Sequence, residues 1–399
     1  MGKCRVCSSN EIYIFMELGN MPNSFHLMSS VSEEVYTQDM RLSYCAECGF
    51  VFFAEPMPSE ELYGNYNWPT SYYPALHLKW LCKKIMCEHL SSKDDFIVEI
   101  GSNDGYFLKM FYDEGYHNLL GVEPAKDCSD IANSNGIHTI NSYYDNTVAE
   151  IIKSNYAEPR AIICRHVIEH VWDIEKFVTS ICSIITKDSI FVVEIPSFEV
   201  ISEKGDFTSL WEQHVNYFCL ETISRVFNRC GLFVEEHHII SFSCGSLLLF
   251  VKLNEQKNNI VNRNDLAQCF RKKARGNIDT LNSYLGSIKD NGGSIAAYGA
   301  GSKGSCLLNI SGAYRHIDYI VDDNPKKIGL FLPGSKIPIL SSEALYKENK
   351  PDYCIISPLN NKENEVGILD KHKKYTELGG KFIELFPKDF RNSLFIENT

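Results

Sequence analysis

The chain has 399 residues, of which 44% are hydrophobic and 23% charged, a composition typical of a soluble globular protein with two or three domains. Its net charge of −12 argues against a surface that binds nucleic acid or acidic membranes, although a locally basic pocket could still hold an anionic small substrate. The sequence shows no signal-peptide core and no apolar run long enough to cross a bilayer, so we expect a cytoplasmic protein. The oligomeric state is left open, and a monomer is compatible with the sequence.

Residues 1–75 are expected to form a separate zinc-binding module. Cys4 and Cys7 make one C-x-x-C pair, and Cys45 and Cys48 make a second. Four thiolates suit a tetrahedral Zn²⁺ ion, whereas one such pair alone could be a redox pair. A site with four cysteine ligands has no open position, so this zinc would be structural. The segment between the two pairs would then form its own small β unit.

Residues 62–73 are rich in aromatic and hydroxyl side chains and are interrupted by Gly and Pro. The composition predicts a loop that is too aromatic to be left in water. It could be a lid over a pocket or a packed linker to the next domain, and the sequence favours neither. A helix is expected to follow over residues 75–92.

The next stretch, residues 96–124, has the pattern of a strand, a glycine-rich turn, a helix, a strand and an acidic tip. A short apolar run ends at Glu99 and is followed by Gly101 and Gly105, and a second apolar run ends at Glu123. An acidic residue about 20 positions after a glycine-rich turn is where α/β sheets hold both hydroxyls of a ribose. The turn is not the G-x-G-x-x-G of dinucleotide binders, so it suits a mononucleoside. Glu99 would repel a phosphate but would suit the ammonium of an amino acid.

This stretch resembles the S-adenosylmethionine (SAM) binding motif of class I methyltransferases, and the alternative is an ordinary βαβ turn. We expect a doubly wound α/β sheet over residues 76–253, with strands at 161–164 and 190–195, a helix at 174–185 and an antiparallel pair at 232–240 and 247–253. Ligands of open α/β sheets lie beyond the carboxyl ends of the strands. The residues expected to contact the cofactor are Glu99, Gly101, Asn103, Asp104, Gly105, Glu123, Pro124 and His166.

The segment after the expected strand at 190–195, residues 197–217, places a histidine among aromatic residues. It contains Trp211, Gln213, His214 and Tyr217. Because this segment would lie over the crevice, its position favours a catalytic role for His214. The alternative is a buried histidine bonded to a backbone carbonyl.

Residues 254–399 are expected to form a C-terminal Rossmann-like α/β domain after a polar helical connector. A strand at 294–298 is followed by a full G-x-G-x-x-G, made by Gly299, Gly301 and Gly304, and the next strand leads to Asp322. Taken alone, this fingerprint predicts NAD binding. The broader expectation is a pyrophosphate or phosphate at a helix N-terminus with Lys303 as counter-charge, which a nucleoside diphosphate sugar would also satisfy. A tight turn without a ligand is the alternative.

The three parts in this order resemble the nucleotide-sugar C-methyltransferases of deoxysugar biosynthesis over nearly the whole chain. The resemblance is carried by the two C-x-x-C pairs, by EIGSNDG with GVEP, and by YGAGSKGSCLLN with DYIVDDNPKKIGLFLPGSKIPI. It departs from the family in the active-site stretch, which commonly reads Tyr-x-Glu-His. Here Trp211 replaces the tyrosine and Gln213 replaces the glutamate, and Trp68 stands where a tyrosine is common.

The resemblance implies a nucleotide-linked 4-keto-6-deoxysugar that is methylated at C3. His214 would remove the proton next to the ketone, and the amide of Gln213 or a nearby tyrosine such as Tyr217 would donate to the enolate oxygen. The residues expected to be catalytic are His214, Gln213, Tyr217, Tyr66 and His166. Those expected to contact the substrate are Trp68, Trp211, Gly299, Gly301, Ser302, Lys303, Gly304 and Asp322.

Three other functions stay open from the sequence. The base could instead deprotonate a hydroxyl or an amine, which would make the chain an O- or N-methyltransferase. The C-terminal fingerprint could serve an NAD-dependent oxidoreductase or epimerase, although no Y-x-x-x-K pair follows it. A non-catalytic sensor of sugar nucleotides could keep both folds.

Overall fold

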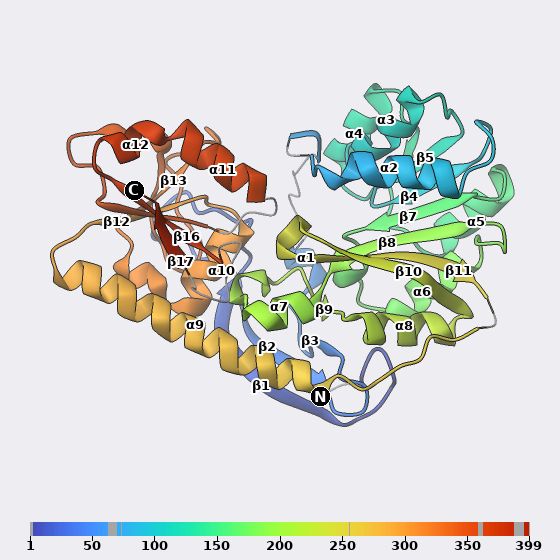
Figure 1. Ribbon diagram of the computed structural model, residues 1–399, viewed down its shortest axis with the longest axis horizontal. Helices are drawn as coiled ribbons and strands as arrows, with labels where there is room; N and C mark the ends of the chain where they lie inside the picture. The colour runs from blue at the N-terminus through green and yellow to red at the C-terminus, as the bar shows by residue number, and fades with distance from the viewer. Residues whose placement is uncertain are drawn as a thin grey trace.

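Three β-sheets organise the computed structural model, which describes residues 3–62, 70–72, 74–254, 256–357, 362–386 and 395–398. Figure 1 shows the central and C-terminal sheets at opposite ends of the molecule, with the N-terminal strands between them. Tyr66 and Trp68, which the sequence places in the aromatic loop, lie outside the described residues.

The N-terminal sheet has the strand order β1-β2-β3-β9. Its first two strands, β1 (Ile12–Pro22) and β2 (Thr37–Cys45), are antiparallel and lie between the two cysteine pairs, where a small β unit is expected. The sheet continues through β3 (Val51–Phe53) to β9 (Asn216–Tyr217). The last strand therefore comes from the segment that contains His214, so the N-terminal part and that segment share one sheet.

The central sheet has the order β10-β11-β8-β7-β4-β5-β6, with the antiparallel pair at one edge as expected. Its parallel strands are fully or almost fully buried, as strands covered on both faces must be. The strands are β4 (Ile97–Ile100), β5 (Leu119–Val122), β6 (Thr139–Ile140), β7 (Ala161–Arg165), β8 (Ile190–Pro196), β10 (Leu232–Ile240) and β11 (Ser246–Leu253).

Helices cover both faces of the central sheet (Figure 1). One hydrophobic cluster joins the sheet to α2 (His77–Glu88), α3 (Tyr106–Asp113) and α4 (Lys126–Ser134). A second cluster joins it to α5 (Asn146–Asn155), α6 (Ile174–Cys182) and α8 (Leu220–Arg229). This is the doubly wound α/β arrangement of a class I SAM methyltransferase, with the antiparallel strands making the sheet mixed.

The C-terminal sheet has the order β14-β13-β12-β15-β16-β17, parallel except for β17. The order is that of a Rossmann fold. Its strands are β12 (Ile295–Tyr298), β13 (Tyr319–Asp322), β14 (Ile339–Ser341), β15 (Tyr353–Ile356), β16 (Lys381–Leu385) and β17 (Phe395–Asn398), and its helices are α10 (Ser302–Ser311), α11 (Lys362–Lys371) and α12 (Lys373–Glu377).

The predicted connector contains the long helix α9 (Asn264–Asp290), which runs along the edge of the C-terminal part toward the N-terminal strands (Figure 1). It packs on α7 (Phe198–Lys204) at one end and on η5 (Ala313–His316) at the other. One hydrophobic cluster contains Phe53, Phe207 and Leu307, which come from the N-terminal, central and C-terminal parts. The boundaries predicted near residues 75 and 253 therefore do not separate independent cores.

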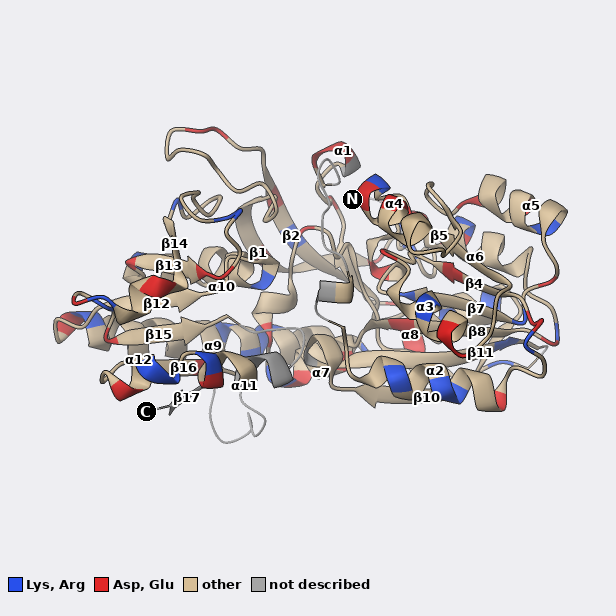
Figure 2. Cartoon of the chain, turned by 90° about the horizontal axis from the view of Figure 1, so that it is seen from above, with Lys and Arg blue, Asp and Glu red and all other residues tan. Residues whose placement is uncertain are grey.

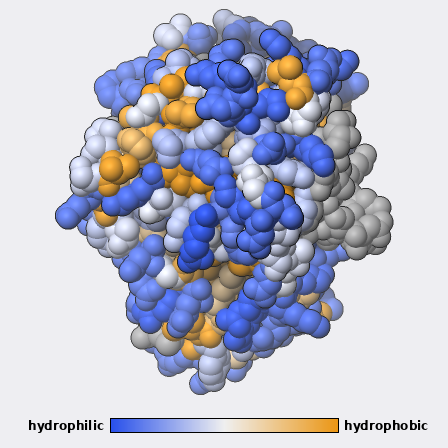
Figure 3. Space-filling view, turned by 90° about the vertical axis from the view of Figure 1, so that its left-hand side faces the viewer, coloured by the Kyte–Doolittle hydropathy of each residue, from blue (hydrophilic) through white to orange (hydrophobic). Residues whose placement is uncertain are grey.

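Charged residues of both signs are interspersed over the elements of the molecule (Figure 2). The side of the C-terminal domain seen in Figure 3 is mostly hydrophilic, with scattered hydrophobic groups. Among the described helices, none combines the length and the hydropathy that crossing a membrane requires.

Candidate functional site

The glycine-rich turn after β4 requires its glycines. Gly101 and Gly105 have φ values of +71° and +75°, in the left-handed region where a side chain is strained. A Cβ atom at Gly101 would lie 2.3 Å from Cγ2 of Val167. The turn is therefore shaped by the absence of a side chain, and it can bring backbone close to a ligand.

Glu123, at the tip of β5, is held toward this turn by backbone amides. Asn103 donates its backbone N–H to Oε2 at 2.9 Å, and Ala125 donates to Oε1 at 2.8 Å. Burial raises the pKa of Glu123, and these two hydrogen bonds oppose that effect. The next residue, Pro124, is exposed. The expected ribose acceptor thus lies beside the glycine-rich turn, as the sequence predicts.

The end of the aromatic loop docks on the same turn. The backbone N–H of Thr70 donates to Oδ1 of Asn103 at 2.8 Å, and that of Ser71 donates to Oδ2 of Asp104 at 2.9 Å. Asn103 itself has a φ of +52°. Asn103 and Asp104 therefore connect residues 70 and 71 to the strand tips, a contact that fits both a lid and a packed linker.

A buried ionic network lies at the tips of β7 and β8. Glu194 accepts from Nε of Arg165 at 2.9 Å and pairs with Nε2 of His166 at 3.0 Å and Nε2 of His77 at 3.1 Å. Nδ1 of His166 is 3.0 Å from Oε1 of Glu169. Burial lowers the pKa of His166, but the two carboxylates outweigh it and raise the pKa to about 9. His166 therefore favours its charged form, in which both ring nitrogens donate to carboxylates. Its predicted catalytic and cofactor contacts stay predictions.

Glu99 has the weakest hydrogen bonding of the carboxylates at the strand tips. It is 1% exposed, its Oε1 is 3.5 Å from Nη1 of Arg165, and its Oε2 has no hydrogen-bond partner among the described residues. Burial raises its pKa to about 8 despite the arginine. A cationic group placed next to Glu99 would restore the charged form.

His214 is a buried and neutral imidazole. It is 8% exposed, and its ring centroid lies 4.5 Å from that of Trp211 and 4.8 Å from that of His170. Burial lowers its pKa well below the usual value, and the neighbouring basic groups of His170, His166 and Lys303 oppose a further positive charge on the ring. No described residue forms a hydrogen bond with its ring. The structure therefore keeps a nitrogen lone pair on His214 at neutral pH, which a general base requires.

The neighbours of His214 are fixed by the N-terminal part. Oε1 of Glu212 accepts from the backbone N–H and the hydroxyl of Ser24, at 2.8 and 2.7 Å. Nε2 of Gln213 donates to the carbonyl of Leu62 at 3.3 Å, while Oε1 of Gln213 is buried without a partner in the described part of the chain. Leu62 accepts from only one of the two hydrogens on Nε2, so the amide of Gln213 keeps a second donor hydrogen beside the unpaired oxygen. Its role as donor to an enolate oxygen stays a prediction.

Tyr217 and Trp211 have different surroundings. Tyr217 is 3% exposed, and its ring packs 5.7 Å from that of Phe53 and 6.0 Å from that of Phe198 inside a hydrophobic cluster. Pairing of β9 with β3 places this ring in the core. The hydroxyl of Tyr217 and the indole Nε1 of Trp211 are both buried and have no hydrogen-bond partner among the described residues, so either could serve as a donor.

The C-terminal glycine-rich loop is tightly closed on itself. Gly299 has a φ of +100°, and a Cβ atom at Gly304 would lie 2.2 Å from the carbonyl oxygen of Gly299. The carboxylate of Asp322 accepts from the N–H groups of Ala300 and Asn324, both at 2.8 Å, and from Nζ of Lys327 at 3.1 Å. Asp322 therefore shapes the loop, and its predicted contact with a ligand stays a prediction.

The start of α10 lies against the segment that contains His214. Helix α10 begins at Ser302 with Gly301 as its N-cap, and it packs on η3 (Phe207–Ser209). The thiol of Cys306 is 3.4 Å from the carbonyl oxygen of Leu210. The charge of Lys303 reaches His214 strongly enough to lower its pKa. The C-terminal loop and His214 thus belong to one region.

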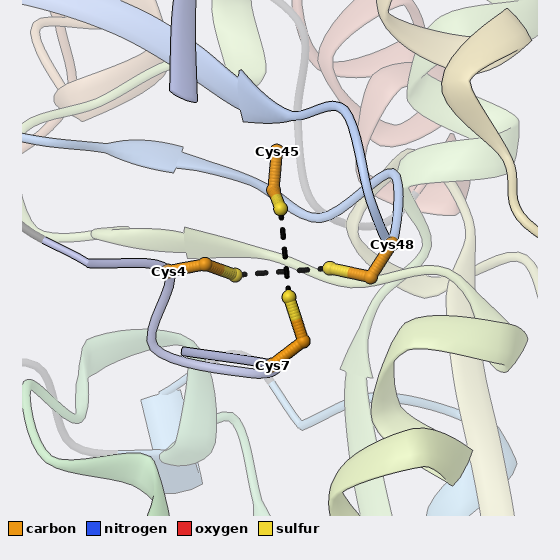
Figure 4. A group of neighbouring side chains, drawn as sticks. All are labelled: Cys4, Cys7, Cys45 and Cys48. Carbon is orange, nitrogen blue, oxygen red and sulfur yellow. Dashed lines mark hydrogen bonds between the residues drawn. The ribbon is translucent and has the colours of Figure 1, made fainter. Parts of the chain in front are cut away.

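The four N-terminal cysteines converge on one point (Figure 4). The Sγ atoms of Cys4 and Cys48 are 3.7 Å apart, those of Cys7 and Cys45 are 3.5 Å apart, and all four lie within 4.8 Å of one another. Tetrahedral Zn–S bonds of about 2.3 Å require sulfur atoms roughly 3.8 Å apart. The cluster is suggestive of the predicted metal site.

Sequence reasoning missed several residues of the region: His77, Glu169, His170, Glu194 and Ser24. Glu169 and His170 directly follow β7 in the run His166-Val-Ile-Glu-His170, and two histidines four residues apart after a strand could have drawn attention to them. Ser24 and His77 come from distant parts of the chain, so no local pattern could have identified them.

Comparison with known proteins gives two family matches. Residues 81–237 match the family described as a methyltransferase domain, and residues 249–387 match the C-methyltransferase C-terminal domain. The chain is 25% identical to the C-methyltransferase NovU of Streptomyces niveus over 409 aligned positions, which cover 97% of this chain and 96% of that protein.

Solved structures give more distant likenesses. The magnesium protoporphyrin IX methyltransferase ChlM of Synechocystis PCC 6803 with bound SAM is 8% identical, with a TM-score of 0.34 over 44% of this chain and 77% of that one. A SAM-dependent methyltransferase of Anabaena variabilis is 14% identical, with a TM-score of 0.36 over 45% of this chain and 85% of that one. The two consecutive family matches, with a C-methyltransferase relative along the whole chain, show that this protein is a SAM-dependent methyltransferase whose C-terminal part is similar to the C-methyltransferase C-terminal domain.

Proposed function

We propose that this methyltransferase methylates C3 of a nucleotide-linked 4-keto-6-deoxysugar, at the carbon next to the ketone. The observation that supports this most directly is the buried, neutral ring of His214, which has no hydrogen-bond partner among the described residues and lies close to the start of α10. A carbon acid next to a ketone needs such a base, because its proton is lost only when the enolate is stabilised.

The reaction can be written with the residues of this chain. His214 takes the proton from C3, and the electron pair moves onto the ketone oxygen. Nε1 of Trp211, a buried donor without a partner in the described structure, is placed beside His214 to donate to that oxygen. SAM supplies the methyl group that the carbon then accepts. Burial around His214 excludes water, which would otherwise return a proton to the carbon.

The cofactor would be held by the tips of β4 and β5. Glu123 would accept the ribose hydroxyls, because backbone N–H groups already orient its carboxylate. Gly101 would let the methionine portion approach the backbone, since a side chain there would fill the space. Glu99 would face the ammonium, which would compensate its buried charge.

The nucleotide diphosphate would be held by the C-terminal loop. The backbone N–H groups of residues 301–305 open α10, and a helix N-terminus favours an anion. Lys303 follows the N-cap and would supply a positive charge. Both contacts would place the sugar next to His214.

The four-cysteine cluster would hold one structural Zn²⁺ ion. Its sulfur spacing fits tetrahedral thiolate coordination, and the set leaves no open position for chemistry. Metal analysis of the purified protein would give about one zinc per chain, and a metal-free protein would reject the assignment.

Hydrogen–deuterium exchange tests the proposed reaction. In D₂O, with SAM omitted, the enzyme should exchange the proton at C3 of a 4-keto sugar nucleotide, and mass spectrometry would read the gain in mass. His214→Asn should lower exchange and methyl transfer by about 10²- to 10⁴-fold, the usual contribution of a general base. Binding of SAM should persist, which shows that the variant is folded.

The same experiment separates the alternatives. A wild-type enzyme that shows no exchange, with the methyl group found on oxygen or nitrogen, would reject C-methylation and leave an O- or N-methyltransferase. An NAD-dependent reaction is disfavoured because the two family matches and the relative are methyltransferases, and because no Y-x-x-x-K pair follows the C-terminal fingerprint. Heat released by NAD but not by SAM in a titration would reverse that conclusion.

A further inference from the structure

Glu169, His170 and His214 form a second group of metal-ligand side chains, separate from the four cysteines. One ligand atom from each residue lies within 4.8 Å of the other two. Glu169 and His170 follow β7, whereas His214 comes from the segment before β9. Glu169 is 1% exposed and His214 is 8% exposed, so the group is enclosed by the fold.

Hydrogen bonds orient His170 as they orient metal-binding histidines. Its Nδ1 is 2.8 Å from the carbonyl oxygen of Gln213. A carbonyl can only accept, so the hydrogen is on Nδ1 and the lone pair is on Nε2. Histidines that bind metals usually donate their other ring N–H to a carbonyl or carboxylate in this way.

Glu169 is oriented and has a free oxygen. Its Oε1 is 3.0 Å from Nδ1 of His166, which fixes the carboxylate, while Oε2 is buried and has no hydrogen-bond partner among the described residues. An unpaired buried carboxylate oxygen is costly, and a bound cation removes that cost. The ring of His214 is likewise without a hydrogen bond in the described structure. Each of the three residues therefore offers one ligand atom.

The ligand set selects the kind of ion. Two imidazole nitrogens and one carboxylate oxygen suit Zn²⁺, with the fourth position left for water. Mg²⁺ and Ca²⁺ prefer sets made of oxygen atoms. An ion bound here would occupy the nitrogen lone pair that His214 needs to accept a proton.

We propose that Glu169, His170 and His214 form a second divalent-cation site, suited to Zn²⁺, whose occupation prevents His214 from acting as a base. The inhibitory effect rests on the proposed role of His214, whereas binding of the ion does not. The site would make the enzyme sensitive to free zinc without any change in the four-cysteine cluster.

Binding is tested by titrating Zn²⁺ into the full-length protein that retains its tightly held metal, followed by calorimetry. One further equivalent should bind to the wild type and be lost in His170→Asn and in Glu169→Gln. The amide of Asn can still donate to the carbonyl of Gln213, so His170→Asn removes the ligand nitrogen and keeps the hydrogen bond. The exposed residues His117 and Glu150 provide the controls His117→Asn and Glu150→Gln, which should bind like the wild type.

Co²⁺ identifies the site that is filled. Thiolate ligands give Co²⁺ strong charge-transfer absorption, which a site of nitrogen and oxygen ligands lacks. Titrated Co²⁺ should therefore add weak visible bands without thiolate charge transfer. Thiolate charge transfer from that added equivalent would overturn the assignment, because the ion would then lie on cysteines.

Inhibition is read from the ratio of exchange rates without and with Zn²⁺. For the wild type this ratio should reach about 10² or more, because the base is lost, and it should fall to near one in His170→Asn and Glu169→Gln. The proposal would be overturned if the wild type bound no second equivalent of Zn²⁺, or if His170→Asn and Glu169→Gln bound it as the wild type does. It would also be overturned if the exchange rate of the wild type rose with Zn²⁺. A wild type that binds the second ion but shows no exchange without it would instead refute the proposed function.

Discussion

Single carboxylates near the strand tips behave differently because their partners differ. Glu194 is completely buried, yet Arg165 and His166 lower its pKa well below the usual value against the effect of burial. Glu99 has one distant contact with Arg165, and burial dominates. The number of close cations decides which effect wins.

The buried carboxyl of Glu99 should make the stability of the protein without ligand depend on pH. The folded protein keeps this proton up to about pH 8, whereas the usual pKa is 4.5, so the folded state binds more protons between these values. The free energy of unfolding should therefore fall as pH rises through this window, and Glu99→Gln should remove that part of the slope. Thermal unfolding at about pH 5 and about pH 9 measures the difference.

Glu150→Gln is the control, because Glu150 is exposed and should leave the slope as in the wild type. An identical pH dependence in Glu99→Gln and the wild type would show that Glu99 is not the buried acid responsible.

The turn between β4 and α3 is an element whose shape depends on missing side chains. Gly101 and Gly105 both have positive φ, and their Cβ positions face Val167 and Ala132. The same geometry brings the backbone of Asn103 to Glu123. A change in this turn should therefore affect stability and cofactor binding together.

Gly101→Ala should lower both stability and SAM affinity. The left-handed conformation costs a non-glycine residue about 1–2 kcal/mol, and the new methyl group would also displace Val167. Gly115→Ala is the matched control, because Gly115 has a φ of +88° but open space around its Cβ position. Gly115→Ala should therefore lose only the stability that the left-handed backbone conformation costs, with no change in SAM affinity. Equal losses of stability in both variants, with unchanged SAM affinity, would argue against the close approach at Gly101.

Hydrogen bonds of Arg5 connect the cysteine cluster to the strand next to His214, the proposed base. Arg5 lies between Cys4 and Cys7, and its guanidinium donates to the carbonyl of Phe53 at 2.8 Å and to Oδ1 of Asn216 at 2.9 Å. These contacts reach the strand that follows His214. The N-terminal part thus supports the segment that contains His214 from outside the central sheet.

Cys45→Ser should prevent binding of the proposed Zn²⁺ and slow methyl transfer while SAM still binds. A shift of about 1 Å in the segment that contains His214 can lower the rate about 10²-fold. Elemental analysis measures the metal content, a SAM titration measures cofactor binding, and an activity assay measures the rate of methyl transfer. Cys87→Ser alters an exposed cysteine and should change none of them. Full turnover after loss of the metal would show that the cluster does not support His214.

The two halves of the site should separate in binding experiments. Glu123→Ala should weaken SAM binding by about 1–3 kcal/mol, the cost of lost charge-assisted hydrogen bonds. It should leave the affinity for the sugar nucleotide unchanged. Lys303→Ala should raise KM for the sugar nucleotide and leave SAM binding unchanged. Each variant is the control of the other, and a fall in SAM affinity in Lys303→Ala would refute this division.

The sequence by itself determined the longer strands and the glycine-rich turns of both large sheets. Buried parallel strands are continuous apolar runs, and tight turns need glycine, so β4, β5 and β12 and their turns could be read locally. The cysteine pairs are equally local signals. Short elements such as β6 and β14, of 2 and 3 residues, have too few residues to show a period.

Only the tertiary structure decided how the site is assembled. Gln213 meets Leu62, Glu212 meets Ser24, and Tyr217 enters the core through pairing with β3. Each of these contacts joins positions far apart in the chain, so residue type alone cannot show which atoms remain free. The protonation of His166 and His214 depends on the same packing, because burial and the distance to neighbouring charges set a pKa, and the sequence contains neither.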